Sequence, residues 1–551
     1  MEDLRLKSFA VGPIPIVNRY IERLGIGQIL SGHIAHDGMV PPEEMILIML
    51  LRNIVMEREP VYGIHDWASR IHPALLGIGE NDIDRINDDR MGRALDALFS
   101  ADRATMLTEL VVGVLKEFQV GMERIHNDTT TVTMTGEYVD ADGSPVRGKK
   151  TPRITHGHNK DHRPDLKQLL LSLTVSADGS VPVHYRSYDG NTADSDTHVD
   201  IWNAIRTLTG SPDFLYVADS KLCVSETMRY IAGKEGRFIT VLPANRGEDG
   251  WFRDFIQEND IPWSPTEVKC SNGKYRVFES PMPSAEGFRI IWVWSGWKSD
   301  HDREVREARM EKAVEGISML NRKLAGRSRI RTRDGAAKVA DQIIDAARRY
   351  LSYRIEETEE EKYRQTRRGR PSPGTAYVRS VRKRFRVIIE PMKENIAYDA
   401  RCDGIFPLIT NDHIAAEEVL ENYKYQPMLE KRNEQIKSVY RVMPMLFKRI
   451  DRIEAFLFIF FAAMIVQALI ERDVRNGMKS SGIHDLPIYP EDKDCESPTA
   501  DRVLSMFSGL QLHRLYSGEN MISVFQPELT NIQRELLRLM NVSQERFEIP
   551  V

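Results

Sequence analysis

The feature that most constrains this 551-residue chain is a change of hydrophobic period near residue 120. Upstream, apolar side chains recur every three or four positions, which predicts amphipathic helices. The segments with this pattern are residues 17–30, 41–59 and 102–120. Downstream, residues 123–136 and 167–190 carry strand-forming residues with a period near two, and Asp178–Gly179 is a turn signal inside the second segment. An all-helical fold is therefore excluded, and we expect an α/β region after a helical N-terminal part.

Beyond this hairpin, helical and strand patterns alternate along the chain. The predicted helices are residues 194–210 and 225–236, and the predicted strands are residues 214–220 and 237–244. Three strands followed by helix, strand, helix and strand is a mixed α/β pattern. It resembles the ribonuclease-H-like, or retroviral-integrase-like, fold, in which three antiparallel strands precede alternating helices and parallel strands.

The core pattern is interrupted and then resumes. The interruption contains five of the seven tryptophans, several strand-like segments and a charged helical run, which together predict a β-rich insertion domain with a helical arm. The predicted domains are 1–115 (helical, for DNA binding or dimerisation), 120–245 (first part of the core), 246–400 (insertion), 401–475 (second part of the core) and 476–551 (a helical tail).

The composition is typical of a soluble cytoplasmic protein. Four cysteines lie far apart without CxxC spacing, which excludes a disulfide framework and a zinc ribbon. The most apolar segment, residues 455–470, is shorter than the ~20 residues of a membrane span. We therefore expect it to be a buried core helix, and we expect no contact with a membrane.

Residues 362–386 form the most strongly charged segment. The net charge of −5 argues against a wholly basic nucleic-acid binder. This segment nevertheless contains ten Lys and Arg residues and no Asp or Glu, with Tyr363, Tyr377 and Phe385 interleaved. Such a density favours contact with a polyanion over a solvated charged loop.

Two aspartates are the first candidates for catalysis. Asp128 and Asp219 each stand at the expected end of a strand, in NDTTTV and VADSKL. Functional groups gather at strand ends in open α/β sheets, so neighbouring strands would bring the two carboxylates together. Such a pair repels unless a cation joins it, and its hard oxygen ligands favour Mg²⁺ or Mn²⁺. The alternative is that both are turn and N-cap residues, for which Asp is well suited.

A third carboxylate is predicted on a helix over residues 415–440. The residues with a distinctive spacing there are Tyr423, Gln426, Glu430 and Lys437. Positions seven apart lie two turns along one helix face, so Tyr423, Glu430 and Lys437 would point the same way. Tyr423 and Lys437 suit a phosphate, and Glu430 suits metal ions, with Glu434 as the competing carboxylate. The alternative is a solvated charged helix.

Together these motifs resemble those of bacterial insertion-sequence transposases with a DDE triad, from the superfamily marked by Tyr-x2-Arg-x3-Glu-x6-Lys. The segments GHNKDHRPDLKQLLLSL and YDGNTADSDTH are also close to family sequences. The likeness covers residues 120–475, and SFAVGPIPIVNRYIERLGIGQIL resembles the helical domain that precedes such cores. Gln426 departs from the family's Arg, and a neutral amide cannot form the Arg fork on a phosphate.

The resemblance implies a transposase that cleaves DNA at insertion-sequence ends and transfers the strands into target DNA. Asp128, Asp219 and Glu430 would hold two Mg²⁺ or Mn²⁺ ions. The implied DNA-contacting residues are Tyr423, Gln426 and Lys437. The implied partners are double-stranded DNA, as terminal inverted repeats and target, and a second copy of the chain in a dimer or larger assembly. Two alternatives are a nuclease of the same fold without strand transfer and a domesticated DNA-binding protein without catalysis.

The segment between the first two predicted strands is rich in histidine. Its metal-ligand types are His156, His158, Asp161, His162 and Asp165. No Cys or Glu completes a set at the usual zinc spacing, and basic residues are interspersed. We therefore predict a loop, near DNA or solvated, in preference to a metal site. Residues 191–194 are predicted to end a strand and cap the next helix, and the family resemblance implies that they lie near the active cleft.

Overall fold

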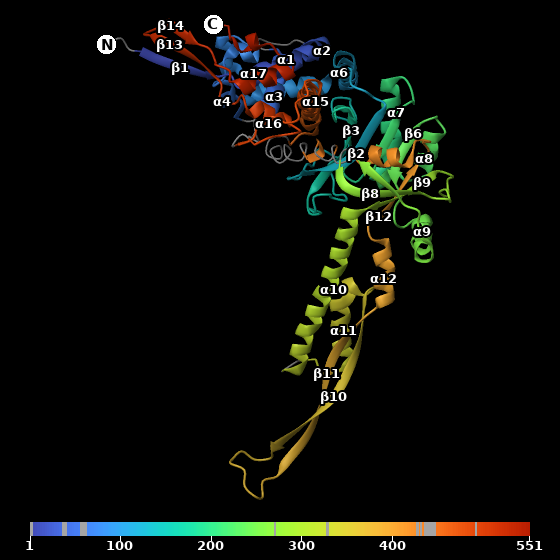
Figure 1. Ribbon diagram of the computed structural model, residues 1–551. Coiled ribbons are helices and arrows are strands. Elements are labelled where there is room, and N and C mark those ends of the chain that lie inside the picture. Colours follow the sequence, from blue (N-terminus) through green and yellow to red (C-terminus); the bar gives the residue numbers. More distant parts are fainter. Residues whose placement is uncertain are drawn as a thin grey trace. The chain divides into compact units, whose positions relative to one another are not determined.

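The structure is a computed structural model in which helices and strands are mixed in both of two compact units (Figure 1). The described residues are 4–35, 41–55, 63–268, 271–326, 330–425, 429, 432–434, 448–490 and 493–550. Unit 1 comprises Met1–Thr240, Thr410–Asp412 and Asn422–Val551. Unit 2 comprises Val241–Ile409 and His413–Glu421. The predicted insertion, residues 246–400, lies within the range of unit 2, whereas residues 1–115 share unit 1 with the first core segment.

The strands of unit 1 carry the first two candidate site residues. These strands are β2 (Arg124–Met134), β3 (Lys167–Ser176), β4 (Pro182–Tyr188), β5 (Leu215–Ala218) and β6 (Arg237–Val241). They lie in the spatial order β4-β3-β2-β5-β6. Neighbours among β2, β3 and β4 are antiparallel, while β5 runs parallel to β2 and β6 parallel to β5. The predicted succession of strands and of the helices α7 (His198–Thr209) and α8 (Ser225–Ala232) is confirmed.

Several helices of unit 1 pack on the long helix α15 (Ile450–Ser480). Helix α15 packs against α3, α5 and α17 and against strand β4. Its most apolar window has a mean hydropathy of 2.4, long and apolar enough to cross a membrane, but 89% of that window is buried inside the protein. The predicted buried core helix is confirmed. The other helices are α1 (Ile14–Arg23), α2 (Ile26–His33), α3 (Pro42–Val55), α4 (Ile64–Ala68), α5 (Asp88–Ser100), α6 (Arg103–Phe118), α16 (Ala500–Ser505) and α17 (Asn531–Leu539).

A small sheet joins distant parts of unit 1 and corrects two predictions. Strand β1 (Leu4–Ala10) pairs with β13 (Gln511–Ser517), which pairs with β14 (Asn520–Phe525). The prediction of wholly helical segments over residues 1–115 and 476–551 is therefore wrong at these strands. Each strand is short, and its partner lies elsewhere in the chain, so local periodicity gives a weak signal for it.

Unit 2 begins with a second group of paired strands. These are β7 (Ser264–Val268), β8 (Ser271–Glu279), β9 (Arg289–Ser295) and β12 (Ile405–Thr410), in the order β12-β9-β8-β7. Helices α9 (Gly247–Glu258) and α12 (Lys393–Cys402) contribute to its apolar core. Within that core, the Trp292 ring stacks on Phe252 with their centroids 3.8 Å apart.

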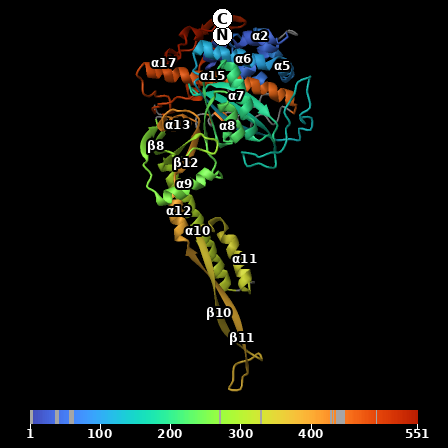
Figure 2. The ribbon, with the colours of Figure 1, turned by 90° about the vertical axis from the view of Figure 1, so that its right-hand side faces the viewer.

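The rest of unit 2 is a long β-hairpin supported by two helices. Strands β10 (Leu351–Gln365) and β11 (Tyr377–Pro391) pair along their whole length. Their inner halves pack on α10 (Gly296–Ala325) and α11 (Arg333–Ile344). In Figures 1 and 2 the hairpin runs beside α10 and continues beyond its end. The basic segment, residues 362–386, thus occupies the outer part of this hairpin and most of β11.

Candidate active site

Asp128 and Asp219 occupy corresponding positions on two neighbouring parallel strands. The parallel register of β2 and β5 begins with Arg124 opposite Leu215 and ends with Asn127 opposite Ala218. Asp128 is the next residue on β2 and Asp219 directly follows the end of β5, so sheet geometry brings both to one place. Strand β2 itself continues to Met134, paired with β3. The prediction that Asp128 ends a strand is therefore wrong, because Asp128 lies within β2 at the point where its parallel neighbour ends.

The two carboxyl groups have raised pKa values, with burial as the largest cause. The pKa of Asp128 is raised to about 6, where the Lys160 ammonium lowers it and the Asp219 charge raises it. The pKa of Asp219 is also raised, although the backbone N–H of Lys221 donates to its Oδ1 at 3.0 Å and opposes the shift. The charge of Asp194 raises the pKa of both groups. Carboxylates that share one field in this way favour a cation between them.

Lys160 and Asp194 complete a charged cluster around these aspartates. The Lys160 Nζ donates to the backbone O of Thr129 at 2.7 Å and to its Oγ1 at 2.9 Å. The same Nζ pairs with Asp194 Oδ2 at 3.0 Å. Thr129 directly follows Asp128 on β2, so Lys160 is held beside the first catalytic candidate.

Two glycines explain how the loops carrying Lys160 and Asp194 meet. A Cβ built on Gly157 would collide with the backbone O of Gly190, and one on Gly190 would collide with the backbone O of Gln168. Gln168 Nε2 donates to the Gly190 O at 2.7 Å across this contact. Only a residue without a side chain permits such an approach. The GHNKDH and YDGNTAD segments therefore pack directly on one another beside β3.

Asn433 contacts the first aspartate from another part of the chain. Its Nδ2 donates to Asp128 Oδ2 at 2.8 Å, and residues 432–434 are helical. Its Oδ1 is buried and has no hydrogen-bond partner within the described residues. Carboxylate and amide oxygens are the donors that Mg²⁺ prefers, so the residues around Asp128 fit a hard divalent ion.

Several contacts attach the segment around Asn433 to the sheet and to α15. The Arg432 guanidinium pairs with Glu471 at 2.6 Å, and both side chains are buried. Arg432 Nε also donates to the backbone O of Ser180 at 3.3 Å. The Tyr425 hydroxyl lies 2.9 Å from the Ser180 Oγ, and its ring lies 5.1 Å from that of His126. The position of Asn433 is thus set by neighbours on both sides.

The predicted third part of the site lies largely outside the described residues. Gln426, Glu430 and Lys437 are not among them. Tyr423 is the last residue of α13 (Ala416–Tyr423), which is followed by a turn at Lys424. The predicted continuous helix is therefore wrong after Tyr423, and the inference that Tyr423 shares one helix face with the later residues no longer holds.

A proline supplies the physical reason for this break. Pro427 lies inside the predicted helix, where proline removes a backbone donor and clashes with the preceding turn. Beyond the break, Glu434 is exposed while its neighbour Asn433 is buried against Asp128.

No three potential metal ligands of the His, Cys, Asp and Glu types converge anywhere in the described part of the chain. Asp128, Asp219 and Asp194 belong to that part of the chain, as do His156, His158 and His162, whereas the third predicted ligand, Glu430, does not. The histidine-rich segment is an irregular loop that leads into β3, as predicted.

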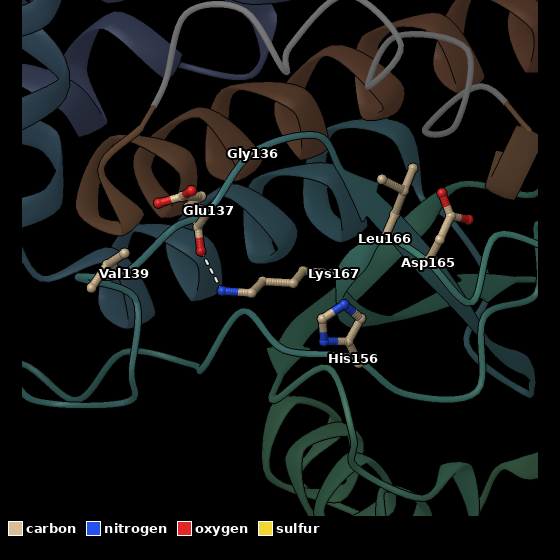
Figure 3. A pocket seen from close by; sticks show the side chains of 7 residues that line it. All are labelled: Gly136, Glu137, Val139, His156, Asp165, Leu166 and Lys167. Atoms are coloured by element: carbon tan, nitrogen blue, oxygen red, sulfur yellow. Dashed lines mark hydrogen bonds between the residues drawn. The ribbon is translucent and has the colours of Figure 1, made fainter.

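A separate pocket of about 300 Å³ lies at the other end of β2. It is lined by Gly136, Glu137, Val139, His156, Asp165, Leu166 and Lys167. Figure 3 shows the Lys167 side chain extending to the backbone O of Glu137, with which it forms a hydrogen bond. Gly136 is eight residues beyond Asp128, or ~25 Å at 3.3 Å per residue of extended strand. This pocket is therefore separate from the carboxylates.

Sequence reasoning did not name Lys160, Asp194 or Asn433 as site residues, although the family resemblance implied that residues 191–194 lie near the active cleft. Lys160 and Asp194 belong to the two segments that resemble family sequences, so a signal for them existed. The prediction assigned these segments to a DNA-facing or solvated loop and to a helix cap. Asn433 carried no local signal, because a single Asn on a charged helix is an ordinary solvated residue.

Comparison with known proteins gives one family model and several solved structures. Residues 7–112 match the family model described as Domain of unknown function (DUF4277). No curated protein matches the chain. Among solved structures, the chain is similar to the cryo-EM structure of the piggyBac transposase synaptic complex with hairpin DNA, with 7% sequence identity and a TM-score of 0.37. That match covers 91% of this chain and 82% of the other.

Proposed function

We propose that this protein is a DDE-type transposase that cleaves DNA at insertion-sequence ends and joins the ends to target DNA. The observation that supports it most is the pair Asp128 and Asp219, next to each other at the end of a parallel register, with raised pKa values. Burying two carboxylates together is unfavourable. A bound cation would offset that cost, and a metal-dependent reaction would explain why the two carboxylates are placed together.

The strand order of unit 1 supports a ribonuclease-H-like core. Numbered along the chain, its five strands lie in the order third, second, first, fourth, fifth, with the fourth parallel to the first. That is the arrangement of three antiparallel strands followed by parallel strands that the sequence pattern resembles. The first aspartate is on the central strand, and the second follows its parallel neighbour.

The third carboxylate of the proposed triad is Glu430. Asn433 reaches Asp128, whereas its neighbour Glu434 is exposed. The exposure of Glu434 and the spacing of the sequence signature support Glu430 over Glu434. Tyr423, Gln426 and Lys437 are proposed to contact DNA phosphates, where Gln426 supplies a neutral hydrogen bond in place of a charged fork.

Asp128, Asp219 and Glu430 would hold two Mg²⁺ or Mn²⁺ ions. The bound ions supply Lewis-acid chemistry at the scissile phosphate, for the attacking water or 3′-hydroxyl and for the leaving oxygen. The aspartates must be ionised to bind these ions. The Lys160 ammonium favours the ionised state, because its charge opposes the increase in both pKa values that burial causes. Asp194 in turn positions Lys160 through their 3.0 Å ion pair.

The test is cleavage of a supercoiled plasmid that carries the DNA flanking the coding region on both sides, with a second plasmid as target. In Mg²⁺ or Mn²⁺ we expect cleavage at the flanks and joining of 3′ ends to the target. Asp128→Asn and Asp219→Asn should each lower the cleavage rate by ~10²–10³-fold, since metal-ion stabilisation is worth several kcal/mol. Asp165→Asn is the matched control, because Asp165 is exposed and pairs with Arg163.

The outcomes separate the alternatives. Cleavage without joining would identify a nuclease of the same fold. Binding of the flanking DNA without cleavage in Mn²⁺ would identify a DNA-binding protein that has lost its chemistry. Equal cleavage by wild type and both Asn variants would refute the site itself.

A further inference from the structure

We propose that the tip of the β10–β11 hairpin, residues 362–382, is a second DNA-binding surface, which contacts the phosphates of duplex DNA. The proposal rests on the proposed function in one respect, because that function supplies duplex DNA as the substrate. The contacts and charges that support it all lie in unit 2, and DNA binding can be measured without catalysis.

The base of the hairpin is held firmly by helix α10. Asn321 on α10 donates from Nδ2 to the Val387 O at 2.8 Å and accepts from the Val387 N–H at 2.8 Å. Arg384 donates to the backbone O of Leu324 at 3.2 Å and of Gly326 at 2.9 Å, where α10 ends. Phe385 and Val387 are buried in the core that α10 and α11 form. The hairpin is thus anchored up to Arg384, and its tip continues past the last helical support.

Opposite charges are matched along the supported part of the hairpin. Acidic residues of β10 lie across from basic residues of β11 and pair with them. The pairs are Glu357–Lys383 at 2.5 Å, Glu360–Arg384 at 2.8 Å and Glu361–Arg379, with Arg354–Glu390 at 2.8 Å nearest the base. The supported part therefore has little net charge and does not by itself attract a polyanion.

Two cations of the tip pair with the end of β10, Lys362 with Glu360 at 3.6 Å and Arg379 with Glu361, but the other cations of the tip have no such partners. Within the described residues, no ion pair involves Arg364, Arg367, Arg368, Arg370 or Arg382. Residues 362–382 contain no Asp or Glu. Tyr363 and Tyr377, which flank the loop, are 62% and 50% exposed. The Thr366 N–H donates to the Ala376 O at 3.0 Å and closes the loop, so these cations are presented together.

Duplex DNA fits this surface better than other polyanions do. The unpaired cations are all arginines, whose planar fork matches phosphate oxygens and guanine edges. A two-stranded ribbon, with strands ~4.8 Å apart, fits the ~12 Å major groove of B-DNA, whereas the major groove of A-form RNA is too narrow for side chains to read. An acidic protein segment would need matching carboxylates in a fixed arrangement, while DNA presents one charge per ~1.7 Å of its axis.

The test uses the full chain without divalent metal and a short fluorescent duplex that lacks the element ends. The variant is Arg367→Gln/Arg368→Gln/Arg370→Gln, and the control is Arg303→Gln/Arg309→Gln/Arg322→Gln, which removes the same charge from exposed positions on α10. Affinity is measured by anisotropy at several salt concentrations. The tip variant should bind at least ~10-fold more weakly at low salt and should reduce the slope of log K against log salt by about 2.7, at ~0.9 per lost phosphate contact. The control should match wild type.

Three results would overturn the proposal. An equal loss of DNA affinity in the tip variant and the α10 control would mean that the total charge of the protein, and not the tip, determines the affinity. Wild-type affinity of the tip variant would show that the tip does not touch the duplex. A loss seen with duplex RNA of the same sequence, or with a polyglutamate peptide, but not with DNA would assign the tip to another partner. Failure of cleavage alone would refute the proposed function and leave this result unchanged.

Discussion

Asp128 carries a carboxylate that is both buried and close to other carboxylates, and each of these two conditions disfavours its ionised form. It lies within the central strand of the unit 1 sheet, where neighbouring groups are buried, and it also faces Asp219 and Asp194. Its Oδ1 accepts from the Thr129 N–H at 2.8 Å and its Oδ2 from Asn433 at 2.8 Å. These bonds and Lys160 offset only part of the cost of burial, because the pKa stays raised at about 6.

The pKa of Asp128 predicts how metal-free protein responds to pH. Its folded-state pKa of about 6 exceeds the ordinary value of 3.8. Between these values the folded state binds more protons than the unfolded state, so stability falls as pH rises through this window and the cost is complete above it. Asp128→Asn should therefore raise the free energy of unfolding by about 1–3 kcal/mol near pH 7.5 and by much less near pH 4.

Thermal midpoints of the two proteins in a chelator, measured across this pH range, check this expectation. Asp165→Asn should give no such gain, because Arg163 lowers the pKa of Asp165. A midpoint difference for Asp128→Asn that does not change with pH would contradict the assigned cause.

At the scale of elements, α15 has a second role beside forming the core of unit 1. Its residue Glu471 accepts from Arg432 at 2.6 Å and from the Ala500 N–H at 3.0 Å. It therefore connects the helix to the segment that carries Asn433 and to the start of α16. A buried ion pair adds little net stability over an apolar pair, but its geometry specifies one arrangement.

Glu471→Gln should release that segment. It removes the charge that pairs with the buried Arg432 guanidinium at 2.6 Å, and breaking a buried pair costs about 3–5 kcal/mol. We expect a loss of about 3 kcal/mol and faster amide exchange in residues 422–425 and 432–434, measured by denaturant unfolding and hydrogen exchange. Glu535→Gln, which breaks the more exposed pair with Arg538, should cost under about 1 kcal/mol. Equal effects of the two variants would argue against the anchoring role of Glu471.

At the scale of the whole chain, unit 1 is closed by a pairing between its two ends. Strand β1 aligns with β13 over Leu4–Ala10, with Phe9 opposite Leu512. Phe9 is buried and its ring lies 5.2 Å from that of His72 in an edge-on arrangement. Arg514 on β13 reaches the same region and pairs with Glu80 at 2.7 Å.

Phe9→Ala should therefore destabilise unit 1 through residues that are remote in sequence. Removing a buried phenylalanine costs about 3–5 kcal/mol, and the edge position places this site near the lower value. Leu4→Ala is the control in the same strand, since Leu4 is 61% exposed. Protection of the β13 amides should fall in Phe9→Ala only. Unchanged β13 protection would show that the pairing contributes little.

The sequence alone determined the features that depend on local periodicity and spacing. Alternation and turn signals specify the strands β2 to β6 and their order along the chain, because a half-buried strand requires a period of two. The apolar run in α15 could be placed only in a core. The NDTTTV and VADSKL segments placed Asp128 and Asp219 on neighbouring strands, and the parallel register of β2 and β5 confirms that placement. Nothing in the structure tests the roles predicted for Asp128, Asp219, Glu430, Tyr423, Gln426 and Lys437.

Tertiary structure decided the features that join segments far apart in the chain. Lys160 and Asp194 meet because Gly157 and Gly190 permit two loops to approach, and Asn433 reaches Asp128 from 305 positions away. The β1–β13 pairing also joins segments that are far apart in the chain. The β10–β11 pairing shows which arginines of the basic segment have no acidic partner. Each of these depends on long-range packing, whose free energy is shared among many residues. A local sequence pattern does not reveal that free energy, so these features could not be predicted from any short segment of the sequence.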